Sequence, residues 1–209
     1  MNNPPQTPPS LLRRLAGRLR GRLGSPPDTA PALDPLLQPH ADKLCDAAQA
    51  VQAIRPYDHV FVGSACATPR VLVAALEALP TPVADVELLH FLTDHAVAHD
   101  DQGKAQTRYR HRSFFVGADM QAAIRQGLAD YVPMSLARVP ELMAIGRIRV
   151  DVALIQVSMP DAFGYVSLGV SVDVVAAAVA QARVVLAEVN PAMPRTMGDA
   201  MLHISQITH

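Results

Sequence analysis

From about residue 41 onward, short apolar runs alternate with longer amphipathic segments. Short apolar runs are typical of buried strands, and apolar positions spaced three or four apart predict helices. Strands are predicted at 58–62, 84–90, 113–116, 130–132, 151–157 and 184–189, and helices at 42–54, 70–79, 119–127, 136–146 and 172–183. Strands this apolar that alternate with helices predict an α/β fold, a mostly parallel open sheet with helices on both faces.

The first 40 residues do not follow this pattern. Nine of the 18 prolines lie within residues 1–39, and proline removes a backbone donor and disfavours helix in the residue before it. We therefore expect a disordered leader over residues 1–40 and one α/β domain over residues 41–209. Within the leader, residues 11–23 gather leucines on one side and most of the arginines on the other. This short amphipathic helix could contact a membrane surface or a partner, belong to an organelle transit peptide, or be a solvated tail.

Charge and composition exclude several classes of function. The net charge is −1, but residues 1–27 hold five Arg and no acidic residue, which leaves 13 basic and 19 acidic residues beyond. A mildly acidic domain, in a chain with only 4% aromatic residues, argues against binding nucleic acid. The chain has no apolar run of about 18 residues that could span a membrane. Two cysteines cannot build a disulfide framework, and they fit a reducing compartment, so we expect a cytoplasmic protein.

In proteins with an open parallel sheet, ligands bind at the carboxyl ends of the strands, where loops lead into helices. The first such loop follows the strand at 58–62, and its small residues let a ligand approach the backbone closely. Its candidate residues are Gly63, Ser64, Ala65 and Thr68. The loop has neither a dinucleotide nor a Walker A pattern, and it could equally be a tight turn. Cys66 lacks a recognisable base in the sequence, so we expect a small buried thiol rather than a nucleophile.

Two further loops carry polar residues after apolar strands. The loop after 151–157 offers Ser158, Asp161 and Gly164, and the loop after 184–189 offers Asn190 and Arg195. The planar guanidinium of an arginine suits a carboxylate or a phosphate. The alternative for Arg195 is an ion pair with a neighbouring aspartate.

The motifs of these loops, read in order, resemble a known family. They are GSACATP at 63–69, FFVG at 114–117, GLADYVP at 127–133, DVALIQVSMPDAFGYVSLG at 151–169 and AEVNPAMPRTMGD at 187–199. They are similar to the N-terminal half of the acetyl-CoA hydrolase/transferase family, which includes acetate and 4-hydroxybutyrate CoA-transferases. The resemblance covers about four-fifths of the chain and leaves out residues 1–40.

The resemblance implies an enzyme of two similar α/β domains that binds acyl-CoA between them and transfers CoA to a small carboxylic acid. It implies a glutamate nucleophile and a glutamyl-CoA thioester, with coenzyme A as substrate and no resident cofactor. In that family the nucleophile belongs to the second half, so no catalytic residue is expected in this chain. We expect a half-enzyme that needs its C-terminal half, a homo-oligomer when complete, and an end near His209 that lies in an inter-domain strand or linker.

Under the same resemblance, the candidate residues take separate roles. The backbone around Gly63, Ser64, Ala65 and Thr68 would approach the acyl-CoA or the acid. Ser158, Asp161 and Gly164 would line the cleft, and Asn190 and Arg195 would position the carboxylate substrate or the nucleophile. Glu188 is the glutamate nearest this site, but it falls within a predicted strand where the family does not place the nucleophile.

Other interpretations stay open at this point. The chain could be a non-catalytic subunit that needs a partner, or an α/β domain that binds a phosphorylated small molecule. A histidine cluster around an acidic stretch suggests a divalent metal site, but no HExxH pattern accompanies it and no metal is expected. Its members are His90, His95, His99 and His111.

Overall fold

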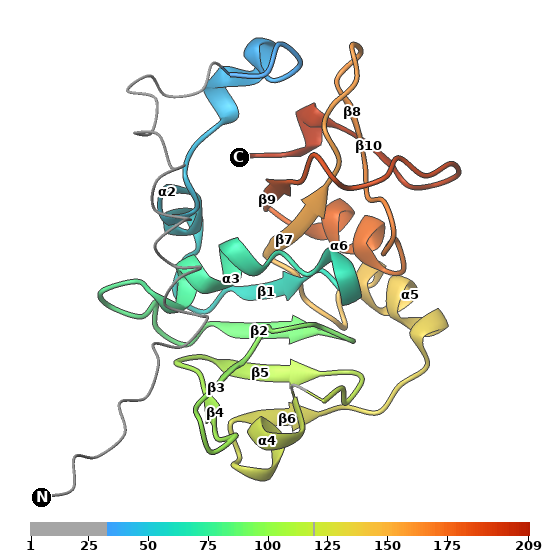
Figure 1. Ribbon diagram of the computed structural model, residues 1–209. Coiled ribbons are helices and arrows are strands. Elements are labelled where there is room, and N and C mark those ends of the chain that lie inside the picture. Colours follow the sequence, from blue (N-terminus) through green and yellow to red (C-terminus); the bar gives the residue numbers. More distant parts are fainter. Residues whose placement is uncertain (1–32, 119) are drawn as a thin grey trace, which may run out of the picture. The chain divides into compact units, whose positions relative to one another are not determined.

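The computed structural model describes residues 33–118 and 120–209 (Figure 1). The chain divides into two units, Met1–Asp34 and Pro35–His209, and the fold below is that of the second unit. The amphipathic helix predicted at 11–23 lies outside the described residues, as does most of the predicted disordered leader.

Six strands form one sheet, in the order β6-β5-β2-β1-β7-β9, and all neighbouring strands in it are parallel. They are β1 (His59–Val62), β2 (Glu87–His90), β5 (Arg110–Ser113), β6 (Ala129–Tyr131), β7 (Val152–Val157) and β9 (Val184–Val189). Two small antiparallel pairs accompany the sheet, namely β3 (Ala98–His99) with β4 (Ala105–Gln106) and β8 (Tyr165–Ser167) with β10 (Met201–His203). The predicted mostly parallel sheet is confirmed.

Helices cover both faces of this sheet, as predicted. The α-helices are α2 (Ala47–Ala50), α3 (Arg70–Glu77), α4 (Met120–Arg125), α5 (Val139–Ala144) and α6 (Val175–Gln181). The 3-10 helices are η1 (Gln38–Lys43), η2 (Val51–Ala53), η3 (Ala65–Ala67), η4 (Leu136–Arg138) and η5 (Ile204–Gln206). Side chains alternate between the two faces of a strand, so Phe61 packs on the face covered by α5 and α6, while Val60 packs on the face covered by α2 and α3.

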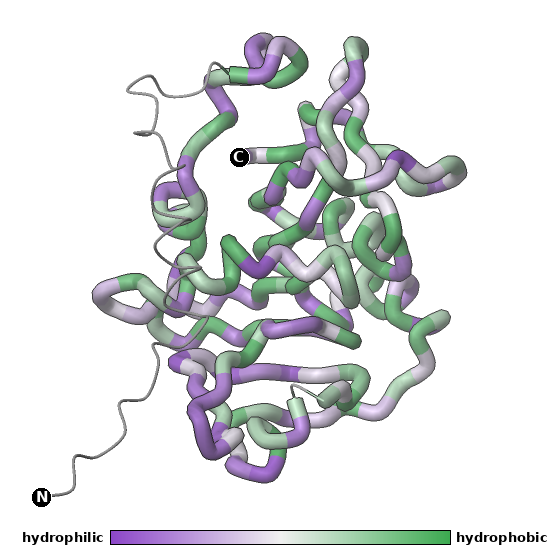
Figure 2. Tube along the Cα trace, viewed as in Figure 1, coloured by the Kyte–Doolittle hydropathy of each residue, from purple (hydrophilic) through white to green (hydrophobic). Residues whose placement is uncertain are grey.

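The prediction of a strand at 113–116 was wrong. The strand β5 spans Arg110–Ser113, and the apolar run begins only at Phe114, where the strand ends. The residues of β5 are hydrophilic (Figure 2). One face of the strand carries arginines, and the other face buries His111 and Ser113. Phe114 instead stacks on Phe91, with ring centroids 4.9 Å apart.

The single helix predicted at 42–54 was also wrong, because Asp46 interrupts it. The carboxylate of Asp46 accepts a 2.7 Å hydrogen bond from the backbone N–H of Gln49, and the side chain of Gln49 accepts one from the backbone N–H of Asp46. This reciprocal capping starts a new helix, α2. The segment therefore consists of η1, α2 and η2 in succession.

The last residues of the chain run along the outer strand β9. The backbone N–H of Thr208 donates to the carbonyl of Val185 at 2.8 Å, and that of Ala187 donates to the carbonyl of His209 at 2.8 Å. Within the described part of the chain, no helix is long and apolar enough to cross a membrane.

Candidate functional site

The three polar loops start from one edge of the sheet. Because β1, β7 and β9 are neighbouring parallel strands, their carboxyl ends lie side by side (Figure 1). The backbone N–H of Gly63 donates to Leu154 O at 2.9 Å, and that of Asn190 donates to Val157 O at 2.8 Å. The sheet hydrogen bonding thus continues into the loops and places them at one edge, as the sequence predicted.

The first loop is a tight turn that holds itself together. A Cβ atom on Gly63 would lie 3.2 Å from the carbonyl oxygen of Ala67, so a side chain there would crowd the backbone. The hydroxyl of Thr68 donates to Ala65 O at 2.7 Å and accepts from the N–H of Asp94 at 3.0 Å. Gly63 and Thr68 therefore shape the turn.

Ser64 differs from its neighbours in this turn. Its side chain is 2% exposed, and its Oγ has no hydrogen-bond partner among the described residues. A buried hydroxyl without a partner costs about 1–3 kcal/mol. A ligand that offers Ser64 a hydrogen bond would recover this energy.

Ser64 and Ala65 line a hollow of about 370 Å³ at the ends of β1, β2 and β5. Its apolar lining consists of Phe91, Leu92, Phe114, Phe115, Met134 and Leu136, and Asp173 is its one ionisable lining residue. Apolar walls with a single hydroxyl suit an apolar group that carries one hydrogen-bonding atom. Sequence reasoning missed these walls, although Phe114-Phe115 after a strand was a usable signal.

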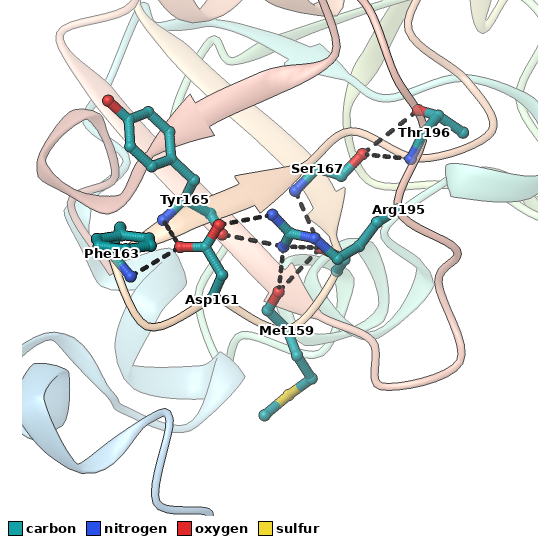
Figure 3. A network of polar contacts seen from close by, with 8 residues as sticks. Met159, Asp161, Phe163, Tyr165, Ser167, Arg195 and Thr196 are labelled. Carbon is teal, nitrogen blue, oxygen red and sulfur yellow. Dashed lines mark hydrogen bonds and ion pairs between the residues drawn. The ribbon is translucent and has the colours of Figure 1, made fainter.

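Arg195 joins the second and third loops (Figure 3). Its Nη1 donates to the carbonyls of Met159 and Tyr165 at 3.0 Å each, and its Nη2 contacts a carboxylate oxygen of Asp161 at 2.9 Å. The Oγ of Ser158 lies 3.4 Å from Nη1 and accepts the N–H of Ser167 at 2.9 Å. Arg195 thus forms the ion pair that the sequence left open as the alternative, and it holds the loop at 158–165 in one shape.

Asp161 has several donors besides Arg195. Its Oδ1 accepts the backbone N–H of Tyr165 and of Phe163 at 2.9 Å each. The hydrogen bond from Tyr165 is the main reason that the pKa of this carboxyl lies below its ordinary value of 3.8, and the bond from Phe163 and the charge of Arg195 act in the same direction. Gly164 allows the turn, because its φ of +81° is one that side chains rarely adopt.

The lowered pKa of Asp161 predicts a loop that loosens in acid. A carboxylate with a lowered folded pKa contributes stability above its unfolded pKa, and this contribution is lost as pH falls through the folded pKa. We expect wild-type protein to exceed Asp161→Asn in stability at pH 6, and the difference to shrink below pH 4. Urea unfolding of both proteins between pH 6 and pH 2.5 measures it. A difference that does not change with pH would contradict the prediction.

A second polar chain links the sheet edge to helix α3. Glu188 accepts the backbone N–H of Val71 at 3.0 Å and the side-chain amide of Gln156 at 2.9 Å. The amide oxygen of Gln156 in turn accepts from the side chain of Asn190 at 3.1 Å. Glu188 therefore caps the N-terminus of α3, where a carboxylate is favoured by the helix dipole, and Asn190 is fixed through Gln156.

Cys66 is exposed, not buried as predicted. The histidines do not form one cluster, since His90 and His111 are buried while His95 and His99 are exposed. Among the described residues, no group of three or more His, Cys, Asp or Glu side chains is arranged to hold a metal ion.

Comparison with known proteins gives this geometry a family context. Residues 36–209 match the family model of the acetyl-CoA hydrolase/transferase N-terminal domain. The chain is 39% identical over 170 residues to a 4-hydroxybutyrate coenzyme A transferase from Clostridium kluyveri, covering 81% of the chain and 39% of that protein. It is 37% identical over 152 residues to a succinyl-CoA:acetate/propanoyl-CoA:succinate CoA transferase from Fasciola hepatica, covering 72% of the chain and 31% of that protein.

The fold is also similar to that of solved structures. The structure of RipA from Yersinia pestis superposes with a TM-score of 0.73 at 29% sequence identity, covering 84% of this chain and 43% of RipA. The chain therefore spans well under half the length of the relatives that it matches.

Proposed function

The chain belongs to the acetyl-CoA hydrolase/transferase family, and we propose from this that it forms the N-terminal part of an enzyme that transfers coenzyme A. The complete enzyme would move CoA between an acyl-CoA and a small carboxylic acid. Coenzyme A is a substrate in this proposal, and the enzyme has no resident cofactor. The C-terminal half would complete the site, and the assembled enzyme would be a homo-oligomer.

The proposed reaction has two covalent stages. A glutamate from the C-terminal half attacks the thioester carbonyl, which releases CoA thiolate and leaves an acyl-glutamyl anhydride. The thiolate attacks the glutamyl carbonyl and releases the first carboxylate, which leaves a glutamyl-CoA thioester. An incoming carboxylate attacks this thioester to give a new anhydride, and the thiolate then attacks the acyl carbonyl to form the new acyl-CoA and free glutamate. Such chemistry predicts ping-pong kinetics.

The glutamates of this chain support a nucleophile elsewhere. The chain has four, and each has polar partners: Glu77 with Thr107, Glu87 with Arg112 at 3.0 Å, Glu141 with Arg138 at 3.0 Å, and Glu188 at the start of α3. Glu188 is the nearest to the site, but its two carboxylate oxygens are engaged with α3 and Gln156. A nucleophile needs a carboxylate that is free to attack. These contacts hold the carboxylates of the glutamates in this chain and therefore oppose such a role.

The observation that carries the proposal is the buried, unpartnered hydroxyl of Ser64, a residue that lines the apolar hollow. We place the acyl group of the substrate in this hollow, against the stacked rings of Phe91 and Phe114, with its carbonyl or carboxylate oxygen accepting from Ser64 Oγ. The apolar walls favour an aliphatic acyl group, and the exposed carboxylate of Asp173 disfavours a second negative charge on the acyl chain.

A binding experiment on this chain tests the placement of the acyl group. We expect butyrate to shift the NMR signals of Leu92 and Phe114, and Ser64→Ala to weaken binding about threefold to tenfold, since one hydrogen bond is lost. Ser205→Ala, in the 3-10 helix η5, is the control and should bind as the wild type does. Shifts elsewhere, or equal binding by Ser64→Ala, would contradict the placement.

An exchange assay tests the activity. This chain combined with a C-terminal half should transfer CoA from acetyl-CoA to a labelled carboxylic acid, and the chain alone should not. Turnover by the chain alone would contradict a nucleophile in the other half. A binding domain for phosphorylated small molecules is the other candidate, and thermal stabilisation by CoA that simple phosphates do not reproduce would count against it.

A further inference from the structure

Two buried histidines lie below the edge of the sheet where the strands have their carboxyl ends, called the carboxyl edge from here on. The proposed exchange chemistry does not use them. His90 is the last residue of β2, His111 lies in the neighbouring strand β5, and both are at most 1% exposed. Burial, and secondarily the neighbouring His111, holds the pKa of His90 well below the ordinary value of 6.5. Burial lowers the pKa of His111 to about 4. Both imidazoles are therefore neutral at pH 7, each with one N–H donor and one acceptor.

The two rings belong to a continuous hydrogen-bonded chain. Thr93 Oγ1 lies 2.9 Å from His90 Nδ1, His90 Nε2 lies 3.1 Å from His111 Nδ1, and His111 Nε2 lies 2.8 Å from Thr107 Oγ1. The hydroxyl of Thr107 donates to Glu77 Oε1 at 2.6 Å. The chain begins beside Leu92, which lines the apolar hollow, and ends at the C-terminus of α3 on a half-buried carboxylate.

Glu77 fixes the direction of every bond in this chain. A carboxylate only accepts hydrogen bonds, so Thr107 gives its proton to Glu77 and must accept from His111 Nε2–H. His111 is neutral, so its Nδ1 accepts from His90 Nε2–H, and His90 Nδ1 accepts from the hydroxyl of Thr93. Both rings therefore carry their proton on Nε2, and every donor points away from the carboxyl edge.

We propose that His90 and His111 form a reversible proton relay between Thr93 and Glu77. When Thr93 Oγ1 receives a proton, each member passes its own proton along the existing bond, and Glu77 becomes protonated. Both rings then carry their proton on Nδ1. The reverse passage returns the proton to the edge and restores the first arrangement. No bond between heavy atoms is made or broken.

The relay rests on the proposed function and adds hydrolysis to it. When water attacks the glutamyl-CoA thioester, its oxygen and one hydrogen join the glutamyl carbonyl carbon, and CoA leaves as thiolate. The second proton of the water then needs an acceptor. The relay would hold this proton and return it to the thiolate, which leaves as the thiol. Exchange of CoA between two carboxylates releases no proton and does not need the relay.

The direction of the relay can be measured on this chain without any activity. Nitrogen NMR of the imidazoles at pH 7 should show both rings protonated on Nε2. In Glu77→Lys residue 77 becomes a donor, so the bonds should reverse and His90, three hydrogen bonds away, should be protonated on Nδ1. Glu141→Lys, which removes an exposed glutamate of α5, is the control and should leave both rings unchanged. If His90 keeps its proton on Nε2 in Glu77→Lys, the relay is wrong.

A second pair of variants covers a failure of Glu77→Lys to fold. Thr107→Val removes the hydroxyl that joins His111 to Glu77, and Thr107→Ser retains it. In the enzyme assembled with its C-terminal half, Thr107→Val should lower the ratio of thioester hydrolysis to CoA exchange about 100-fold, the lower end of what proton transfer by a positioned side chain contributes. Thr107→Ser should keep the ratio. An equal ratio in the two variants, or no hydrolysis by the wild type, would overturn the relay, whereas absence of CoA exchange would contradict the proposed function.

Discussion

Leu154→Ala is expected to lower the free energy of unfolding of this chain by about 2–5 kcal/mol. Leu154 lies in the middle of β7, where it pairs with Val62 of β1 and Leu186 of β9, and its side chain is 0% exposed. It belongs to the cluster of buried side chains beneath α2 and α3. The truncation leaves a cavity that the paired strands cannot close, and typical domains have only about 5–15 kcal/mol of stability.

Urea unfolding of the chain measures this loss, with Leu44→Ala as the matched control. Leu44 is 37% exposed and follows the 3-10 helix η1, so its truncation should cost less than about 1 kcal/mol, in the range of surface substitutions. Similar losses in the two variants would show that β7 is not the centre of the core.

The fold was predictable where burial on both faces leaves a simple pattern. The predicted strand at 184–189 agrees with β9 at both ends, and that at 151–157 exceeds β7 by one residue. Apart from Gln156 and Glu188 near the strand ends, their residues are apolar on both faces because helices cover each side. Strand β5 lacks this signal, because its burial of His111 depends on hydrogen bonds rather than on apolar character.

The site was predictable in its location but only partly in its contacts. Parallel topology brings the ends of β1, β7 and β9 together, and this follows from the order of strands and helices alone. Whether Arg195 meets a substrate or Asp161 depends on two loops 34 residues apart in sequence, which no local pattern determines. The sequence likewise does not show that Ser64 lacks a hydrogen-bond partner. Thr68 lies in the same turn and has two side-chain hydrogen bonds, so the difference depends on the folded turn.

The position of Arg195 suggests how this residue would act on catalysis. Its guanidinium donates to two backbone carbonyls and pairs with Asp161, all within the loop at 158–165 (Figure 3). We therefore infer that Arg195 is a positioning residue, which shapes the loop at the sheet edge rather than binding the substrate carboxylate itself. Loss of this support would displace the loop against the substrate, and a displacement of about 1 Å can cost about 100-fold in rate.

We therefore expect Arg195→Ala to lower kcat/KM about 100-fold in the enzyme assembled with its C-terminal half, mainly through kcat. Arg195→Lys should recover only part of the loss, because an ammonium group cannot reproduce the planar fork that reaches both Asp161 and the carbonyls. Arg147→Ala removes an exposed arginine next to α5 and should leave the kinetics unchanged. Steady-state kinetics on the three variants, with thermal unfolding to confirm folding, measure the effect. A loss confined to KM would indicate direct binding of the carboxylate, and unchanged kinetics would remove Arg195 from the site.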